Sequence, residues 1–233
     1  SPADLVLKSA RVDAGMTVFA AELGPRVIGG RRSLREWKVP LLGQHNALNA
    51  IAAIAAASEA GIPDAAIKKA LGSFSGVKRR FQLTGTWNGI AVYDDYGHHP
   101  VEINAVLRAA RSGARGNVIA VVEPHRYTRV RDLFDEFAAC FADADSVIVT
   151  PLYSAGEAPI DGVSHITLAE AIRSTGHASV AAVDAVGDIV PLLRRISAPG
   201  DMVVCLGAGN STDWAHALPE WLAQEPMRVG GRA

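Results

Sequence analysis

The sequence predicts an α/β fold: a doubly wound, mainly parallel sheet, preceded by a smaller segment of strands and two helices. Beyond residue 89, apolar strand-like runs alternate with helix-like segments at the spacing typical of βαβ units. The first 40 residues carry strand patterns and turn signals instead. An alanine-rich helix pattern and a second helix pattern separate these two parts.

The smaller segment begins with a predicted hairpin, because residues 5–7 and 16–20 flank the turn signal Asp13-Ala14-Gly15. An edge strand is expected over 37–42. The alanine-rich helix covers 50–60 and is closed by Gly61, and the second helix runs from Pro63 to Leu71.

The larger part begins with a second predicted hairpin, over 81–86 and 89–93, in which Asn88-Gly89 is the turn signal. Further strands are predicted over 117–122, 146–150, 179–183 and 202–206. Helices are predicted over 100–111, 130–142, 168–174, 185–196 and 211–222. Right-handed crossovers between parallel strands give this order a doubly wound topology.

Composition excludes several classes of protein. The 233 residues hold 23 Lys and Arg against 24 Asp and Glu, so no charge excess points to nucleic acid or to a membrane surface. The apolar runs are too short to span a bilayer, and the two cysteines, Cys140 and Cys205, have no disulfide or zinc spacing. We expect a cytoplasmic monomer or homodimer. Because the chain opens without Met, we also expect it to be part of a longer protein.

Polar turns follow four of the predicted strands. The richest holds Asp94, Asp95, Tyr96, His98 and His99 within residues 93–100. The others cover 123–129, 150–157 and 207–210. In open α/β sheets the carboxyl ends of parallel strands and the helix N-termini converge on one edge, so we expect a ligand pocket there. A plainer alternative is that the aspartates cap helices and the histidines lie on the surface.

Two of these turns suit particular ligands. Arg126 and Arg129 share one face if their turn is helical, and paired guanidinium groups suit a carboxylate or a phosphate. Gly207-Ala208-Gly209-Asn210 lets the backbone approach a phosphate closely. Without the third glycine of the dinucleotide motif, however, a tight packing turn explains it better.

Two segments of the smaller part also carry polar groups. His45, Asn46 and Asn49 crowd the start of the first helix, and Asn49 there indicates a hydrogen-bonding role, because Asn is a poor helix-interior residue. The alternative is a capping Asn46 and a tolerated Asn49. Lys78-Arg79-Arg80 marks the expected domain boundary. It is either a solvated linker or the source of a guanidinium that stacks on a base or binds a phosphate.

Taken together, these motifs resemble the Mur ligases of peptidoglycan synthesis in order and spacing. The matching motifs are Gly43-x-His45-Asn46-x-x-Asn49-Ala50, Lys78-Arg79-Arg80-Phe81, Asp94-Asp95-Tyr96-Gly97-His98-His99-Pro100, Pro124-His125-Arg126-Tyr127-x-Arg129, Tyr153-x-Ala155-Gly156-Glu157 and Gly207-Ala208-Gly209. The resemblance covers nearly all of residues 1–222 and includes six ordered motifs.

The resemblance implies a division into domains. Residues 1–79 would be the end of the central ATP-binding domain, 80–224 the Rossmann-like C-terminal ligase domain and 225–233 a disordered tail. The family's UDP-binding domain and its Gly-x-x-Gly-Lys-Thr-type phosphate loop have no counterpart in this sequence. We therefore expect the isolated 233-residue chain to be inactive.

Within the family, the motifs best match the branch that joins L-alanine to UDP-N-acetylmuramate through an acyl phosphate, a step in cell-wall biogenesis that supports cell shape and division. The resemblance implies ATP and Mg²⁺, with the Mg²⁺ ligands mainly outside this chain. It also implies that Asn49, Arg80, Asp95 and His45 bind ATP. Tyr96, Arg126 and Arg129 would hold the amino acid, and His98 and His125 are the candidate catalytic residues.

Three alternatives stay open. Glu123 stands where this branch usually has Gln, and Glu-Pro-Arg is instead a feature of the related ligase that recycles murein tripeptide. A metal-dependent hydrolase could use Asp94, Asp95, His98, His99 and His125, all of which are residue types that bind divalent metals. A non-catalytic nucleotide-binding module could use residues 207–210 alone.

Overall fold

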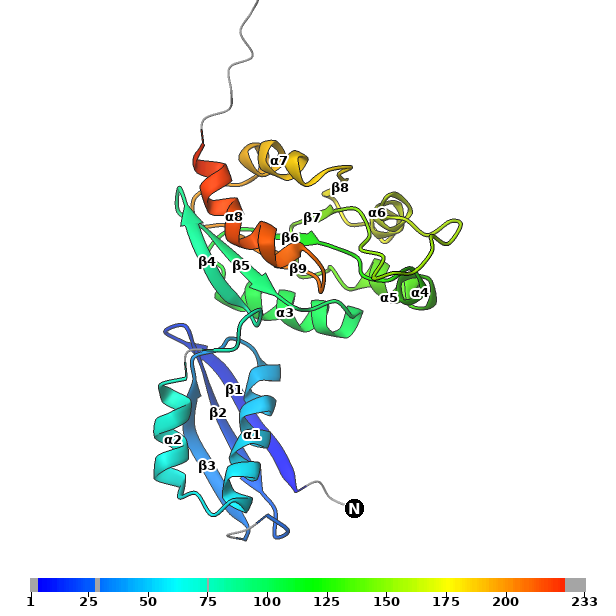
Figure 1. The fold of residues 1–233 in the computed structure, drawn as a ribbon. Coiled ribbons are helices and arrows are strands. Elements are labelled where there is room, and N and C mark those ends of the chain that lie inside the picture. Colours follow the sequence, from blue (N-terminus) through cyan, green and yellow to red (C-terminus); the bar gives the residue numbers. More distant parts are fainter. Residues whose placement is uncertain (1–3, 28–29, 75, 225–233) are drawn as a thin grey trace, which may run out of the picture.

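The computed structural model describes residues 4–27, 30–74 and 76–224, which form two units joined near residues 76–81 (Figure 1). The smaller unit has an antiparallel sheet of three strands in the order β1-β2-β3, with two helices on one face. Its elements are β1 (Leu5–Asp13), β2 (Met16–Leu23), β3 (Arg32–Val39), α1 (Gln44–Glu59) and α2 (Asp64–Gly72).

The larger unit contains a sheet of six strands in the order β4-β5-β9-β6-β7-β8, in which only the β4–β5 pair is antiparallel. Its strands are β4 (Gln82–Trp87), β5 (Ile90–Asp95), β6 (Val118–Val122), β7 (Ser146–Val149), β8 (Val180–Ala182) and β9 (Met202–Leu206). Its helices are α3 (Pro100–Gly113), α4 (Tyr127–Asp132), α5 (Phe134–Ala139), α6 (His165–Ser174), the 3₁₀ turn η1 (Val186–Asp188), α7 (Ile189–Ile196) and α8 (Ser211–Ala223).

Two apolar cores lie on opposite faces of the six-stranded sheet. Residues of α3, α5 and α6, such as Leu107, Phe137 and Leu168, pack on one face. Residues of α7 and α8, such as Leu193 and Leu218, pack on the other. Helices on both faces of a mainly parallel sheet confirm the predicted α/β, doubly wound fold class.

Several predicted boundaries differ from the structure; the alanine-rich helix, for example, begins at Gln44 rather than at residue 50. The expected strand over 37–42 is β3, which ends at Val39 because Pro40 has no N–H to donate to a neighbouring strand. The single helix expected over 130–142 is divided into α4 and α5, because Leu133 leaves the helical region with φ −123°. The helix expected over 185–196 begins as the 3₁₀ turn η1. The predicted disordered tail, 225–233, lies outside the described residues.

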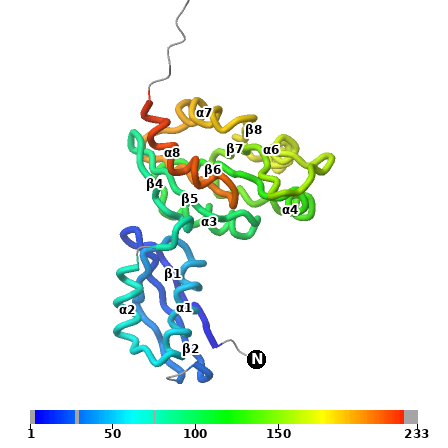
Figure 2. The backbone as a smooth tube through the Cα atoms, in the orientation of Figure 1, coloured from blue at the N-terminus to red at the C-terminus, as the bar shows by residue number. Residues whose placement is uncertain are grey.

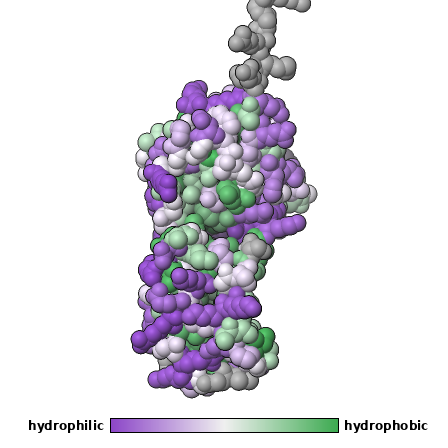
Figure 3. Space-filling view, turned by 90° about the vertical axis from the view of Figure 1, so that its left-hand side faces the viewer, coloured by the Kyte–Doolittle hydropathy of each residue, from purple (hydrophilic) through white to green (hydrophobic). Residues whose placement is uncertain are grey.

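The two units touch where α3 passes the N-terminus of α1 (Figure 2). Gly43, the N-cap of α1, allows this approach, because a Cβ there would lie 2.8 Å from the Cβ of Ala109. On the face shown in Figure 3, hydrophilic side chains dominate the smaller unit, and apolar ones gather on the larger unit beside the junction. None of the described helices is long and apolar enough to cross a membrane.

Candidate active site

Four aromatic and imidazole rings form a row along the carboxyl edge of the sheet. Tyr96 and His98, which follow β5, meet edge to face at 5.0 Å between ring centroids. His98 lies 5.8 Å from His125, which follows β6. His125 stacks on Tyr153, which follows β7, at 5.2 Å with an interplanar angle of 14°. The structure thus brings three of the predicted site residues together and adds Tyr153, which belongs to one of the six motifs but was given no role from the sequence.

The two predicted guanidinium groups lie beside this row. Arg129 Nη1 is 3.3 Å from His125 Nδ1 and donates to the His125 carbonyl oxygen at 3.4 Å. Arg126 Nε donates to Glu157 Oε1 at 2.8 Å, and the Arg126 side chain is half-exposed. Arg126 also has a positive φ of 71°, which is uncommon for a residue other than glycine. Such backbone strain clusters at ligand-binding sites.

Electrostatics set the protonation of two groups in this region. Burial is the largest effect that lowers the pKa of His125, and the neighbouring guanidinium groups of Arg129 and Arg126 lower it further. Hydrogen bonds from the N–H and hydroxyl of Thr128 lower the pKa of Glu157 to about 2, with a contribution from Arg126. His125 is therefore favoured as a neutral imidazole that can accept a proton, and Glu157 is a permanent anion near neutral pH.

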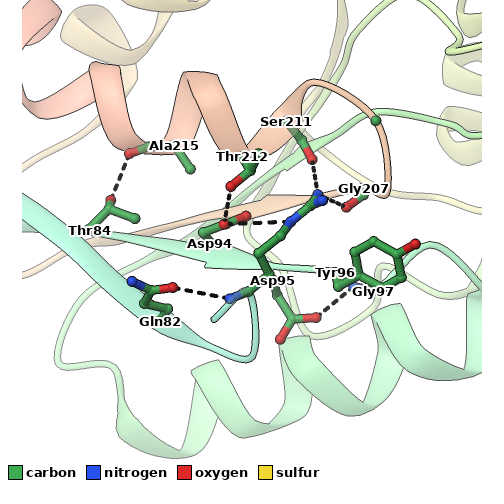
Figure 4. Close-up of polar contacts among 12 residues, drawn as sticks. Gln82, Thr84, Asp94, Asp95, Tyr96, Gly97, Gly207, Ser211, Thr212 and Ala215 are labelled. Carbon is green, nitrogen blue, oxygen red and sulfur yellow. Dashed lines mark hydrogen bonds and ion pairs between the residues drawn. The ribbon is translucent and has the colours of Figure 1, made fainter. Parts of the chain in front are cut away.

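Asp94 joins the linker to α8 (Figure 4). Its fully buried carboxylate accepts a hydrogen bond from Thr212 Oγ1 at 2.6 Å and lies 3.8 Å from Arg79 Nε. Arg79 in turn donates to the Gly207 carbonyl oxygen at 2.7 Å, and its guanidinium lies 4.7 Å from the centre of the Tyr96 ring. Arg79 thereby fastens the linker to the edge that carries the site, a role that the sequence did not indicate.

Asp95, a predicted ATP contact, is also buried. Its Oδ2 accepts the Phe81 N–H at 2.8 Å, and its Oδ1 accepts the Gly97 N–H at 2.7 Å. Burial raises the pKa of Asp95 to about 6, against the opposing effect of these two hydrogen bonds. Both oxygens are therefore committed to holding the linker and the loop after β5, and a ribose could use only their remaining lone pairs.

Three other predicted ATP contacts, His45, Asn49 and Arg80, line one cavity of about 880 Å³ between the two units. Its walls are mainly apolar faces of α1 and α2, with the N-terminal part of α3 and the linker on the other side. Burial, and secondarily Arg80, lowers the pKa of His45. A largely apolar cleft with a few polar groups is typical of a site for a planar organic ligand.

The side-chain amides of Asn46 and Asn49 in this cavity are oriented by hydrogen bonds. Asn46 Nδ2 donates to the Leu42 carbonyl oxygen at 2.8 Å, so the Asn46 Oδ1 is free to accept from Asn49 Nδ2 at 3.4 Å. Asn49 is exposed and keeps its own Oδ1 for a ligand. Asn46 therefore orients Asn49 rather than capping the helix, since α1 has no side-chain cap bond.

Glu123 fills the glycine turn after β9. Its carboxylate accepts hydrogen bonds from the backbone N–H groups of Gly209, Asn210 and Ser211 at 3.1, 3.1 and 3.3 Å. These donors lie at the N-terminus of α8, where an anion is stabilised. Burial nevertheless raises the pKa of Glu123.

Comparison with known proteins identifies the family. The family described as "Mur ligase, glutamate ligase domain" matches residues 79–209, more than half of the chain. The chain belongs to the Mur ligases.

Curated Mur ligases agree with this assignment. UDP-N-acetylmuramate–L-alanine ligase of Brucella anthropi is 52% identical over 96% of this chain and 47% of its own length. The protein of the same name from Paramagnetospirillum magneticum is 54% identical over 89% of this chain and 44% of its own length. The chain therefore spans about half the length of the curated relatives that it matches.

Solved Mur ligases share the fold. UDP-N-acetylmuramate–alanine ligase of Thermotoga maritima aligns with a TM-score of 0.72 at 26% identity, over 93% of this chain and 45% of that one. A murein peptide ligase of Psychrobacter arcticus aligns with a TM-score of 0.61 at 22% identity, over 94% of this chain and 44% of that one, a likeness of fold alone.

The geometry of this Mur ligase chain gives no support to the two alternatives from other classes. In the part of the chain that the structure describes, no three His, Cys, Asp or Glu side chains come close enough to hold a metal ion. His99 accepts from the Val101 N–H as the N-cap of α3, a capping role that the plainer alternative had given to the aspartates. The N–H groups that a nucleotide phosphate would need at residues 209–211 are already taken by Glu123.

Proposed function

We propose that this chain is the part of an ATP-dependent UDP-N-acetylmuramate:L-alanine ligase that binds the amino acid and the adenosine of ATP. In this proposal residues 1–79 end the central ATP-binding domain and 80–224 form the C-terminal ligase domain. The observation that carries the proposal is the presence of Arg126 and Arg129 near His125, whose pKa both lower, at a sheet edge of a chain 52% identical to a ligase of that name.

The amino-acid site follows from charge and hydrogen-bonding geometry. A zwitterionic amino acid needs a cationic clamp for its carboxylate and a basic group for its ammonium proton. Arg126 and Arg129 would bind the carboxylate, with Tyr96 at the side of the pocket. His98 or His125 would then take a proton from the ammonium, so that the free amine attacks the acyl carbon and phosphate leaves. The lowered pKa of His125 keeps its imidazole unprotonated, and so available to accept that proton.

The adenosine site is proposed in the cavity between the units. Its apolar helix faces would hold the base, Asn49 would accept a hydrogen bond from the adenine amino group, and Arg80 would lie against the ring. His45 lines the same cavity. Asp95 would contribute indirectly, by fixing the linker that carries Arg80, and directly only through its free lone pairs.

Mg²⁺ does not fit the residues described. Both oxygens of Asp95 accept backbone N–H groups, the Asp94 carboxylate is fully buried, and the described residues contain no cluster of metal ligands. No step here is therefore assigned to a metal on this chain.

The test is phosphate release from ATP by the natural polypeptide that carries these residues, with UDP-N-acetylmuramate and one amino acid at a time. Release should require both co-substrates and should be greatest with L-alanine. Release that depends on a murein tripeptide instead would indicate that the chain belongs to the ligase that recycles this tripeptide. Release that ignores every amino acid would contradict the proposal.

A further inference from the structure

The loop after β7 is fastened to the turn that carries His125 and Arg126. The Tyr153 N–H donates to the Pro124 carbonyl oxygen at 2.8 Å, and the Arg126 N–H donates to the Tyr153 carbonyl oxygen at 2.8 Å. These bonds extend the parallel pairing of β6 and β7 beyond the ends of both strands, in a bridge between His125 and Tyr153. The two segments are therefore held together as one body at the sheet edge.

Within this body, Tyr153 lies between His125 and the glycine turn after β9. Its ring stacks on the imidazole of His125. On Gly209, a Cβ would fall 2.6 Å from Cγ and Cδ2 of the Tyr153 ring, so only a glycine lets the backbone come this close. Glu123 holds the Gly209 N–H at 3.1 Å, so the ring is supported by a fixed piece of backbone.

Glu157 holds Arg126 in a comparable way. It bonds only the Nε of the guanidinium, at 2.8 Å, and this leaves both Nη groups available for a ligand. Glu157 is itself held by the Thr128 N–H at 3.0 Å and the Thr128 hydroxyl at 2.7 Å. A guanidinium fixed through Nε keeps the fork of donors that suits a carboxylate.

We propose that Tyr153 and Glu157 are positioning residues of the amino-acid site, Tyr153 by fixing the imidazole plane of His125 and Glu157 by fixing the guanidinium of Arg126. This inference rests on the function proposed above and extends it to two residues that touch the substrate-binding groups rather than the substrate. A displacement of about 1 Å in such groups is enough to change catalysis by about two orders of magnitude.

The experiment compares steady-state kinetics of the natural polypeptide with Glu157→Gln, Tyr153→Leu and Tyr153→Phe. Glu157→Gln keeps the shape but removes the charge, and we expect it to raise the KM for L-alanine about tenfold while kcat and the KM for ATP change less than about twofold. Glu136→Gln, on the exposed side of α5, is the matched control and should behave like the wild type.

Tyr153→Leu removes the ring that covers His125, so water reaches the imidazole and its pKa rises toward the ordinary value. The acidic limb of the kcat/KM profile for L-alanine should then move to higher pH. Tyr153→Phe keeps the ring and should keep the wild-type profile. Thermal unfolding of each variant, measured in parallel, separates these effects from a loss of folding.

Three results would overturn the inference. The first is a wild-type KM for L-alanine in Glu157→Gln, together with an unchanged pH profile in Tyr153→Leu. The second is an equal loss in kcat and in both KM values that follows the melting temperature, since that indicates a purely structural role. The third is phosphate release by the wild type that ignores amino acids, which refutes the proposed function itself and is recognised without any variant.

Discussion

Glu123 Oε2 lies 3.1 Å from the backbone nitrogen of Gly209, so a carboxylate from the end of β6 occupies the glycine turn after β9. The turn is therefore a helix N-terminus closed by the protein's own anion, rather than a phosphate cradle. Gly209 also lies against the Tyr153 ring, so residues that follow β6, β7 and β9 meet at the site.

Removing this carboxylate should destabilise the fold. In Glu123→Ala three backbone N–H groups at the start of α8 lose their acceptor, and we expect the free energy of unfolding to fall by about 2–3 kcal/mol. Glu123→Gln keeps one acceptor oxygen and removes a buried charge, so its loss should be about 1 kcal/mol or less. Urea unfolding measures both, and equal stability of Glu123→Ala and the wild type would contradict the capping role.

Asp95 should make stability depend on pH. Its pKa is about 6 in the folded chain against 3.8 in the unfolded one, so the folded state binds more protons between these values. The free energy of unfolding that Asp95 contributes is fully present below about pH 4. It falls by at most about 3 kcal/mol as the pH rises through about 6.

The comparison protein for this prediction is Asp95→Asn, which cannot titrate at that position. The unfolding free energy of the wild type minus that of the variant should decrease from pH 4 to pH 7. A difference that stays constant over this range would mean that Asp95 has an ordinary pKa.

The cavity between the units offers a matched pair of substitutions on α1. Ala53 lines the cavity and Ala52, its exposed neighbour, does not. Ala53→Phe should fill the base site and weaken the binding of an ATP analogue at least about tenfold, whereas Ala52→Phe should leave it unchanged. Titration calorimetry of both variants checks this, and equal affinities would exclude the cavity as the adenosine site.

Local sequence patterns were sufficient to predict the order of the helices and strands. Strand and helix periodicity, with turn signals such as Asn88-Gly89, predicted both hairpins and the doubly wound sheet, because these features depend on near neighbours. The division at Leu133 was not predictable in this way. Nor was the hydrogen bond from the Thr128 N–H, near the start of α4, to Glu157, which comes from a loop 29 residues further along the chain.

The sequence predicted that the polar turns after the strands gather at one edge of the sheet, but not which groups their side chains bond to. Arg79 bonds Gly207 across 128 residues, and Glu123 bonds Gly209 across 86. Asp95 illustrates the same limit: a carboxylate after a strand suggests a ligand contact, yet the Phe81 and Gly97 N–H groups bind both of its oxygens. Such contacts depend on the tertiary fold, which no local pattern contains.

The most direct test of the account compares Arg126→Ala with Arg131→Ala in the phosphate-release assay of the natural polypeptide. Arg131 lies on the same short helix, α4, and is exposed, where it pairs with Asp132. We expect kcat/KM for L-alanine to fall about 100-fold in Arg126→Ala, because a charged hydrogen-bonding partner of the carboxylate is lost, and to stay within about twofold of the wild type in Arg131→Ala. Equal effects of the two substitutions, or none from either, would contradict an amino-acid site at Arg126.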